Sequence, residues 1–289
     1  MEKHTKKGVK ENWSSQAARS RANRSASSAP VGLELKNYEK LLKKALVGRR
    51  LPRVLVLGAT PELRDLAIKL DVETLAVDVS QDMLDKMTEI MKYKNSPKNL
   101  FRLADWLALD KTLAHGSFDA VLADASLNNI APERYDKMLK ILSRLLKSGG
   151  HFITRHYVYL PEKLKDSLAQ VQAKYNQGRL NWLWITIHLG QYTNWQKEIY
   201  NPKTRKFFYS KLMPKLFKAI DSGEIKIKKS DINKLENVKF HASRVIHISL
   251  PEKAWQKLVK KYFIIDNRIQ VKNLEWTEYG PTWYFKKKI

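Results

Sequence analysis

Ten residues, Val54 to Leu63, constrain the fold more than any other part of the chain. They begin with four consecutive aliphatic residues, which suit a strand buried on both faces of a parallel sheet. Gly58 then allows a tight turn, and Thr60 followed by Pro61 is typical of the N-cap and first position of a helix. A buried strand, a turn and a helix in this order predict the ligand-binding edge of an open α/β sheet.

The same alternation continues along the chain. Further strand patterns follow at Thr74–Val77, Leu100–Leu103, Phe118–Asp124 and His151–Tyr157. Repeated β–α units of this kind predict a Rossmann-like, doubly wound and mostly parallel sheet. A helical pattern in Pro251–Lys261 precedes two more strand patterns, Tyr262–Ile265 and Thr282–Phe285. We therefore expect the sheet to close on an antiparallel hairpin.

Changes in this pattern predict how the chain is divided. Residues 1–30 are polar and basic without periodic apolar residues, so we expect a disordered tail. Residues 31–50 carry an apolar helical stripe and predict a leading helix. The α/β core is expected in residues 51–160 and 251–289. Residues 161–250 break the alternation and predict a mostly helical insert that serves as a substrate lid or cap.

Composition limits the kinds of chemistry that the chain can perform. The chain has 289 residues and no cysteine, which excludes disulfides, thiolate metal sites and a cysteine nucleophile. We predict no metal site. No apolar run approaches the roughly 20 residues that span a membrane, so we expect a cytoplasmic protein without a membrane segment. Nothing in the sequence indicates an oligomeric state.

The net charge of +25 is concentrated at the two ends of the chain. Residues 1–50 carry 13 Lys and Arg against 4 Asp and Glu, and residues 161–289 carry 26 against 11. Residues 51–160 are almost neutral, with 15 against 14. Basic regions of this kind favour a polyanionic partner such as RNA, but an ordinary solvated lysine-rich surface is the alternative.

Acidic residues end three of the predicted strands, at Asp78, Asp105 and Asp124. Because the carboxyl ends of parallel strands meet at one edge of a sheet, we expect these side chains beside the Gly58 turn. Asp78 follows Gly58 by 20 residues, which is the spacing at which a carboxylate binds ribose hydroxyls. The three acids and the turn together predict a nucleoside-binding edge.

The first turn does not suit a pyrophosphate. A dinucleotide site needs the pattern G-x-G-x-x-G, whereas Gly58 is the only glycine here. Pro61 lacks an N–H group, and Glu62 would repel a phosphate at the start of the helix. A ligand with ribose and adenine but no phosphate fits better. S-adenosylmethionine is such a ligand, and its positive sulfonium and ammonium groups favour nearby carboxylates.

The chain resembles class I S-adenosylmethionine-dependent methyltransferases. The stretches that carry the resemblance are Val54–Leu63, Leu75–Ser80, Ala104–Trp106, Phe118–Asp124 and Leu145–Gly150. It departs from the family in the first turn, where Gly-Ala-Thr-Pro-Glu has a single glycine instead of a G-x-G loop. The resemblance implies S-adenosyl-L-methionine as the cofactor.

The resemblance also implies a role for each conspicuous position at the sheet edge. The first turn holds the methionine moiety, the acid after strand two binds the ribose, and the two residues after it lie beside the adenine. The acid and the tryptophan after strand three contact the adenine, and the acid after strand four borders the methionine end and the substrate. In this chain the first turn is Gly58, Ala59 and Thr60. The acid after strand two is Asp78, and Val79 and Ser80 follow it. The acid and the tryptophan after strand three are Asp105 and Trp106, and the acid after strand four is Asp124.

The catalytic residues stay unknown, because the cofactor supplies the electrophile and the protein supplies orientation. If a general base is needed, His156 and Tyr157 after the fifth strand are the best placed, with Asp124 next. For His156 the alternative is a surface position without a role.

The insert predicts the part that selects the methyl acceptor. Its aromatic residues favour either a lid for a small organic molecule or a second small hydrophobic core; they are Trp182, Trp184, Tyr192, Trp195, Tyr200, Phe207, Phe208 and Tyr209. Neighbouring cations such as Lys203, Arg205 and Lys206 favour an RNA groove instead. Three functions stay open: a methyltransferase acting on a small or otherwise undefined acceptor, an RNA methyltransferase, and a non-catalytic cofactor-binding domain.

Overall fold

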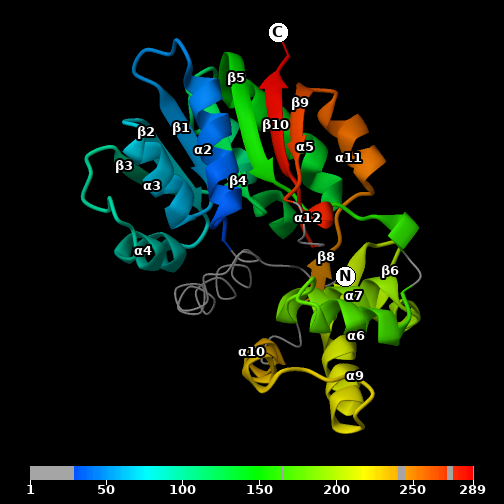
Figure 1. Ribbon diagram of the computed structural model, residues 1–289. Helices are drawn as coiled ribbons and strands as arrows, with labels where there is room; N and C mark the ends of the chain where they lie inside the picture. The colour runs from blue at the N-terminus through cyan, green and yellow to red at the C-terminus, as the bar shows by residue number, and fades with distance from the viewer. Residues whose placement is uncertain (1–28, 164–165, 240–244, 272–275, 289) are drawn as a thin grey trace.

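The computed structural model of the chain describes residues 29–163, 166–239, 245–271 and 276–288. The predicted tail, residues 1–30, lies outside the described residues except for its last two positions. The described chain forms a sheet with helices on both faces and a smaller cap at one end of that sheet (Figure 1).

The main sheet has seven strands in the order β3-β2-β1-β4-β5-β10-β9. Their bounds are β1 Arg53–Leu57, β2 Glu73–Asp78, β3 Asn99–Leu103, β4 Phe118–Asp124, β5 Leu146–Arg155, β9 Phe263–Ile269 and β10 Thr282–Lys287. Strands β1 to β5 pair in parallel, and β10 pairs antiparallel with both β5 and β9. The predicted fold class, a Rossmann-like sheet that closes on an antiparallel hairpin, is confirmed.

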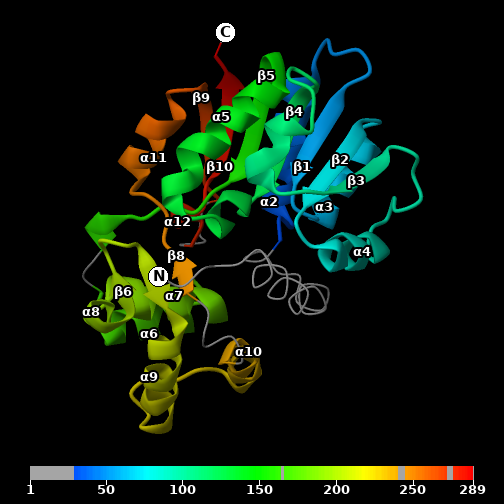
Figure 2. The same cartoon turned by 180° about the vertical axis from the view of Figure 1, so that it is seen from behind.

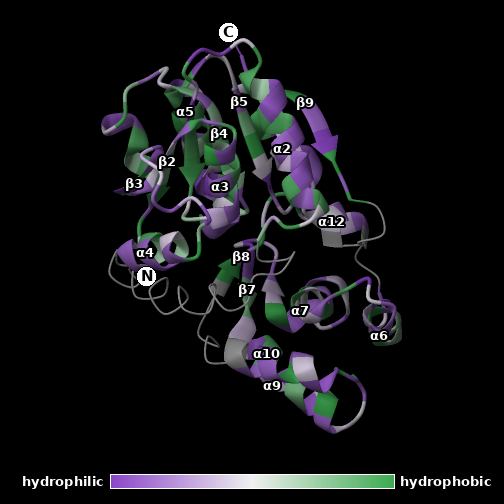
Figure 3. Cartoon of the chain, turned by 60° about the vertical axis from the view of Figure 1, so that its left-hand side comes forward, coloured by the Kyte–Doolittle hydropathy of each residue, from purple (hydrophilic) through white to green (hydrophobic). Residues whose placement is uncertain are grey.

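Helices cover the two faces of this sheet. The helices of the two layers are α2 Leu33–Leu46, α3 Pro61–Lys69 and α4 Gln81–Glu89 on one face, and α5 Tyr135–Leu145 and α11 Glu252–Val259 on the other. Figure 2, the view from behind, brings α5 and α11 forward. In Figure 3 the visible side of α2 is mainly hydrophilic, because its apolar stripe faces the sheet. Each layer therefore encloses its own hydrophobic core against the strands.

The cap follows β5 and precedes α11. Its elements are α6 Leu168–Asn176, α7 Trp182–Tyr192, α8 Gln196–Ile199, β6 Tyr200–Asn201, β7 Lys206–Phe208, α9 Tyr209–Asp221, α10 Lys229–Lys239 and β8 Val245–His247. The three short strands form an antiparallel sheet that the sequence did not predict, because strands of two or three residues are too short to display a period. The N–H of Tyr159 donates to the carbonyl oxygen of Leu250 at 3.0 Å, so the chain leaves and re-enters the core side by side.

Short elements follow several strands of the core at the end where the cap lies. They are the 3-10 turns η1 Trp106–Lys111, η2 Ser126–Asn129, η3 Pro132–Arg134 and η4 Pro161–Lys163, and the helix α12 Trp276–Tyr279. β8 of the cap packs against η2, which directly follows β4. The cap therefore lies at the carboxyl edge of the parallel strands (Figure 1).

The fifth strand differs from its prediction. The strand pattern began at His151, but β5 begins at Leu146 and includes residues 147–150. The pairing of β4 with β5 shifts register between Phe118 and Ala120, and Gly149 has a φ angle of +66°. A bulge thus absorbs the two glycines, and the strand ends two residues earlier than expected, before His156 and Tyr157.

Candidate functional site

Gly58 lies where the chain turns from β1 toward α3, at the carboxyl edge of the sheet. Its φ angle of +94° favours glycine, and its N–H donates a 2.8 Å hydrogen bond to the carbonyl oxygen of Val77. A Cβ atom built on Gly58 would lie 3.8 Å from a side-chain atom of each of Asp78, Trp106 and Ser126. Residues after three neighbouring strands therefore surround the glycine, and we call the space left by its missing side chain the Gly58 cradle.

The carboxyl group of Asp78 is buried at the end of β2. Its Oδ1 accepts a 2.9 Å hydrogen bond from the N–H of Ser80, and the N–H groups of Val79 and Ala59 also donate to this carboxyl group. Burial raises the pKa of Asp78 from 3.8 to about 6, and the three N–H donors oppose that rise. The group is therefore ionised at neutral pH, held by N–H donors, and able to accept further hydrogen bonds from hydroxyl groups.

Three predicted cofactor residues shape the backbone beside the cradle. Ser80 is the N-cap of α4, and its Oγ accepts a 3.3 Å hydrogen bond from the N–H of Met83. Val79, directly before this N-cap residue, is partly exposed. Thr60 and Pro61 occupy the N-cap and first position of α3 as the sequence predicted, but within the described chain the Thr60 side chain makes no capping hydrogen bond. Thr60 therefore has the predicted N-cap position but lacks the side-chain hydrogen bond that usually accompanies it.

Trp106 joins the ends of β2 and β3 to the first turn. Its indole N–H donates a 2.7 Å hydrogen bond to the carbonyl oxygen of Val77, and its ring edge lies at the Gly58 cradle. Asp105 precedes it and is exposed; its Oδ1 accepts a 2.9 Å hydrogen bond from the N–H of Leu107 and caps η1. The structure thus brings Trp106 to the predicted site and places Asp105 at its solvent side.

Ser126 is the cradle residue that the sequence analysis missed. Its hydroxyl donates a 2.6 Å hydrogen bond to the carbonyl oxygen of Leu57, directly before Gly58. The preceding Ala125 has a φ angle of +53°, a conformation that costs a non-glycine residue roughly 1–2 kcal/mol. Such strain is often found at functional sites. A single serine after a strand belongs to no distinctive sequence pattern, so nothing in the sequence indicated its role.

Asp124 is the last residue of β4, and its carboxylate forms an ion pair with an arginine. The Nε and Nη2 of Arg155, at the end of β5, donate to its two oxygens at 2.7 and 2.8 Å. Nη1 of Arg155 donates to both oxygens of Glu34 on α2, each at 2.9 Å. Both oxygens of Asp124 therefore already accept bonds from a buried guanidinium, and its contact with a cofactor or substrate stays a prediction.

Glu34 and Tyr38 are one helical turn apart on α2 and complete this cluster. The Tyr38 hydroxyl donates to the carbonyl oxygen of Ala123 and accepts from the N–H of Arg155, both at 2.6 Å. Burial raises the pKa of Glu34 from 4.5 to about 7, and Arg155 opposes that rise while Asp124 adds to it. We call Glu34, Tyr38, Asp124 and Arg155 the arginine cluster. It fastens the leading helix to the carboxyl edge of β4 and β5.

His156 is not on the surface, so that alternative prediction was wrong. The residue is fully buried, its ring stacks on Trp255 at 4.0 Å, and its Nε2 lies 2.9 Å from the Ser249 hydroxyl. Burial lowers the pKa of His156 to about 3, so the imidazole is neutral at physiological pH. A base that is penalised for accepting a proton is poorly suited to general base catalysis.

Tyr157, next to His156, is partly buried. Asn128 holds its backbone, donating through Nδ2 to the carbonyl oxygen at 2.9 Å and accepting from the N–H at 3.1 Å. The ring lies 5.2 Å from Trp184 of the cap, and Gly280 packs against it without room for a side chain. Burial raises the pKa of Tyr157 well above its ordinary value, which opposes a role as general base. Tyr157 links the core to the cap.

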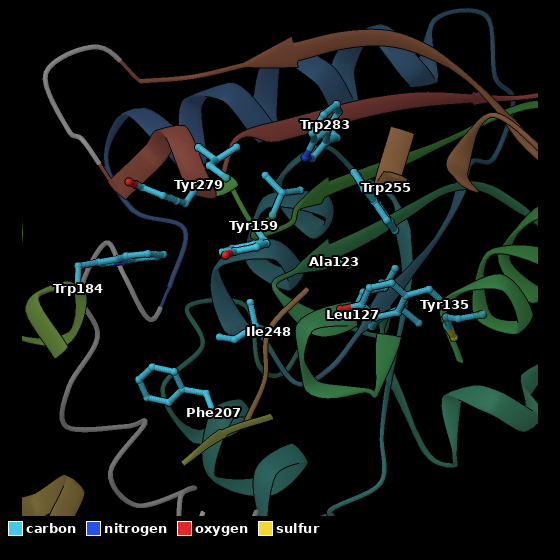
Figure 4. Packing of buried hydrophobic residues seen from close by; sticks show 14 of the residues in the cluster. Ala123, Leu127, Tyr135, Tyr159, Trp184, Phe207, Ile248, Trp255, Tyr279 and Trp283 are labelled. Atoms are coloured by element: carbon cyan, nitrogen blue, oxygen red, sulfur yellow. The ribbon is translucent and has the colours of Figure 1, made fainter. Parts of the chain in front are cut away.

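The aromatic residues of the cap do not form a separate hydrophobic core. Six of the eight predicted residues are buried, and they belong to the same hydrophobic cluster as the α5 face of the sheet. Figure 4 shows Trp184, Phe207 and Ile248 of the cap region together with Ala123 and Leu127 of the core. The cap is therefore packed firmly onto the edge that carries the Gly58 cradle.

The part of the chain that the structure describes shows neither a metal-binding cluster nor a membrane-spanning helix. Within residues 29–163, 166–239, 245–271 and 276–288, no group of three or more His, Asp or Glu side chains is arranged to hold a metal ion. Over the same ranges, no helix has the length and apolar character needed to cross a bilayer.

Comparison with known proteins agrees with this geometry. The sequence model of a family described as a methyltransferase domain matches residues 60–206, which include most of the Gly58 cradle and half of the cap. No curated protein sequence matches the chain.

Several solved structures share the fold across nearly the whole chain. The 1,6-didemethyltoxoflavin-N1-methyltransferase of Burkholderia thailandensis, solved with 1,6-didemethyltoxoflavin and S-adenosylhomocysteine, is 12% identical with a TM-score of 0.54, covering 97% of this chain and 88% of that one. The N-methyltransferase NodS of Bradyrhizobium japonicum, solved with S-adenosylhomocysteine, is 11% identical with a TM-score of 0.51, covering 95% and 98%. A putative methyltransferase of Haloferax volcanii, solved with the Trm112 methyltransferase activator, is 13% identical with a TM-score of 0.51, covering 96% of each chain.

Proposed function

The chain belongs to the methyltransferase-domain family, and we propose that it transfers a methyl group from S-adenosylmethionine to a small organic acceptor. The observation that carries this proposal is the Gly58 cradle, where Asp78, Trp106 and Ser126 approach one glycine from three strand ends. This is the edge at which open α/β sheets bind nucleosides.

The residues around the cradle fit a charged nucleoside without phosphate. The absent Cβ of Gly58 leaves room for a ligand close to the backbone, and Asp78 offers an ionised carboxylate to ribose hydroxyls. Glu62 in the first turn of α3 disfavours a phosphate at that helix terminus. A positive sulfonium and two ribose hydroxyls match these groups, whereas a pyrophosphate does not.

We assign the predicted cofactor residues to parts of this ligand. The backbone of the first turn holds the methionine moiety, the Asp78 carboxylate holds the ribose, and the residues after β2 and β3 flank the adenine. The first turn consists of Gly58, Ala59 and Thr60. The residues that flank the adenine are Val79 and Ser80, which follow Asp78 after β2, and Asp105 and Trp106 after β3. Ser126 joins the set because its hydroxyl lies at the cradle. Asp124 acts indirectly, by holding Arg155 and α2 in place.

S-adenosylmethionine, when bound, supplies an electrophilic methyl group. The chain then has to orient an acceptor and exclude water, and positioning alone can lower a barrier by up to roughly 7–11 kcal/mol. The cap contributes to both tasks, because Tyr157 and Trp184 pack together beside the segment that follows β4. We propose that residues 161–250 act as the substrate cap on the core of residues 51–160 and 251–289.

An RNA acceptor is a second candidate, supported by the charge of the cap. Residues 161–250 carry 17 Lys and Arg against 7 Asp and Glu. Exposed lysines gather on α9, on α10 and in the segment between them, including Lys211, Lys218, Lys226, Lys228 and Lys229. Against RNA, most of the cap aromatics are buried in the core and are not available to stack on bases.

Calorimetry with S-adenosylhomocysteine tests the shared premise. We expect binding to the full chain in the micromolar range, and no binding at millimolar ligand would overturn both enzymatic proposals. RNA binding followed over a salt series then separates the acceptors. A steep loss of affinity with salt favours RNA, because each neutralised phosphate releases a counterion, and a flat response together with methylation of small nucleophiles favours the first proposal.

A further inference from the structure

Strand β3 is an open edge of the main sheet. It pairs with β2 on one side only, from Thr74 opposite Asn99 to Asp78 opposite Leu103, and within the described chain no strand lies on its other side. In a parallel ladder alternate residues bond to the same neighbour. Lys98 and Ala104 bond to β2, so the backbone groups of Phe101 and Leu103 face outward.

The side chains of this edge are unusually apolar and exposed. Leu100, Phe101 and Leu103 have 41%, 48% and 47% of their surface accessible, whereas the neighbouring residues of β2 from Thr74 onward are buried. Proteins usually protect edge strands with charges, bulges or a covering element, because a free apolar edge pairs with other chains. β3 carries one charged residue, Arg102.

The opposite edge of the sheet shows the usual protection. β9 carries Asp266, Asn267 and Arg268 in its second half, and its pairing with β10 shifts register between Tyr284 and Phe285. Its exposed apolar residue is Ile264. The β9 edge is therefore protected against pairing with another strand, whereas the β3 edge is not.

The charge around β3 indicates what kind of strand would pair with it. Residues 90–104 contain no acidic residue and four basic ones, of which Lys98 pairs with Asp71 and the others are Lys92, Lys94 and Arg102. A second copy of the chain would bring two such positive segments together. The chain's own residues 1–28 carry seven Lys and Arg against two Asp and Glu, so they are also repelled. Charge complementarity requires an acidic strand from elsewhere.

We propose that β3 is a docking edge for a partner protein, which adds a strand with acidic and apolar residues in alternation. The partner's backbone bonds to the outward N–H and carbonyl groups of Phe101 and Leu103, and its apolar side chains cover those of β3. Its acidic side chains lie against Lys92, Lys94 and Arg102. Because β3 leads directly into Asp105 and Trp106, the docked strand also braces the adenine side of the proposed cofactor site.

Site-specific crosslinking tests this edge. The chain has no cysteine, so Phe101→Cys in the full chain accepts a benzophenone label at one position, and Ile264→Cys on β9 is the matched exposed control. The labelled proteins are irradiated in extract of the source cells. We expect one protein to crosslink through position 101 and not through position 264, and the purified partner to bind the unlabelled chain.

The purified complex supplies the deciding measurements. We expect Phe101→Ser and Arg102→Glu each to weaken the partner's binding by about tenfold or more, with the wild-type complex weakening as salt is raised. Both substitutions are at exposed positions, and unchanged thermal unfolding of the free chain shows that the fold is intact. Crosslinks only to a second copy or to residues 1–28, no crosslink above the control, or unaltered affinity of the variants would overturn the proposal. None of these outcomes depends on methyl transfer.

Discussion

Arg155 and Asp124, the last residues of two neighbouring strands, are joined by paired hydrogen bonds of 2.7 and 2.8 Å. The same guanidinium binds Glu34, so one buried cation faces two buried carboxylates. The arrangement fixes α2 across the edge where the proposed cofactor lies. Asp124, which the sequence predicts as a ligand contact, therefore also helps to anchor α2.

Replacing Arg155 tests this anchoring. Arg155→Leu leaves the Asp124 and Glu34 carboxylates buried without their partner, and breaking a buried ion pair in this way costs about 3–5 kcal/mol. We expect that loss in the free energy of unfolding, measured in urea. Arg144→Leu is the control, because its ion pair with Asp110 is partly exposed and should contribute less than about 1 kcal/mol. Equal effects of the two changes would contradict the anchoring role.

The second carboxylate of the cluster predicts how stability depends on pH. The folded pKa of Glu34, about 7, is above its ordinary value of 4.5, so folding favours the protonated form. The stabilising contribution of this group is full below pH 4.5 and is lost as the pH rises through 7. Glu34→Gln keeps a neutral side chain there, so we expect its unfolding temperature to fall less than that of the wild type between pH 6 and pH 8. A parallel decline in both proteins would show that Glu34 does not titrate in this range.

Gly58→Ala tests the cradle itself. The added Cβ would contact Asp78, Trp106 and Ser126 at ordinary distances, so it fills the space without a clash, and the positive φ angle adds a strain of roughly 1–2 kcal/mol. We expect modest destabilisation and at least about a tenfold loss of S-adenosylhomocysteine affinity, measured by calorimetry. Gly48→Ala is a matched control, because Gly48 has a φ angle of +71° and no atom within 4 Å of the added Cβ. It should show the strain and keep the affinity; loss of affinity in both variants would assign the effect to strain.

The sequence predicted the sheet and most of the cradle because both depend on local patterns. Buried strands appear in the sequence as runs of aliphatic residues, and Gly58, Asp78 and Trp106 lie at or just after the ends of such strands. The arginine cluster was not foreseen, because Glu34 and Arg155 are 121 residues apart and a buried ion pair leaves no periodic signal. His156 was misplaced for a related reason: its burial depends on Ser249 and Trp255, and Ser249 already lies 93 residues further along the chain.

Asp78 provides the most direct test of the cofactor site, because two pH effects of opposite sign are expected from one group. Its folded pKa of about 6 is above 3.8, so in the ligand-free chain its stabilising contribution is lost as the pH rises through 6. Ribose hydroxyls bond to the ionised form, so binding lowers this pKa, and the affinity for S-adenosylhomocysteine should fall as the pH drops below 6. We expect Asp78→Asn to abolish this pH dependence between pH 5 and 7.5 and to weaken binding by about 1.5–3 kcal/mol, the value of a charge-assisted hydrogen bond. Asp82→Asn removes an exposed carboxylate from the first turn of α4 and should change neither property. If the Asp78 variant keeps the wild-type affinity and pH profile, the ribose lies elsewhere and the assignment of β2 to the cofactor fails.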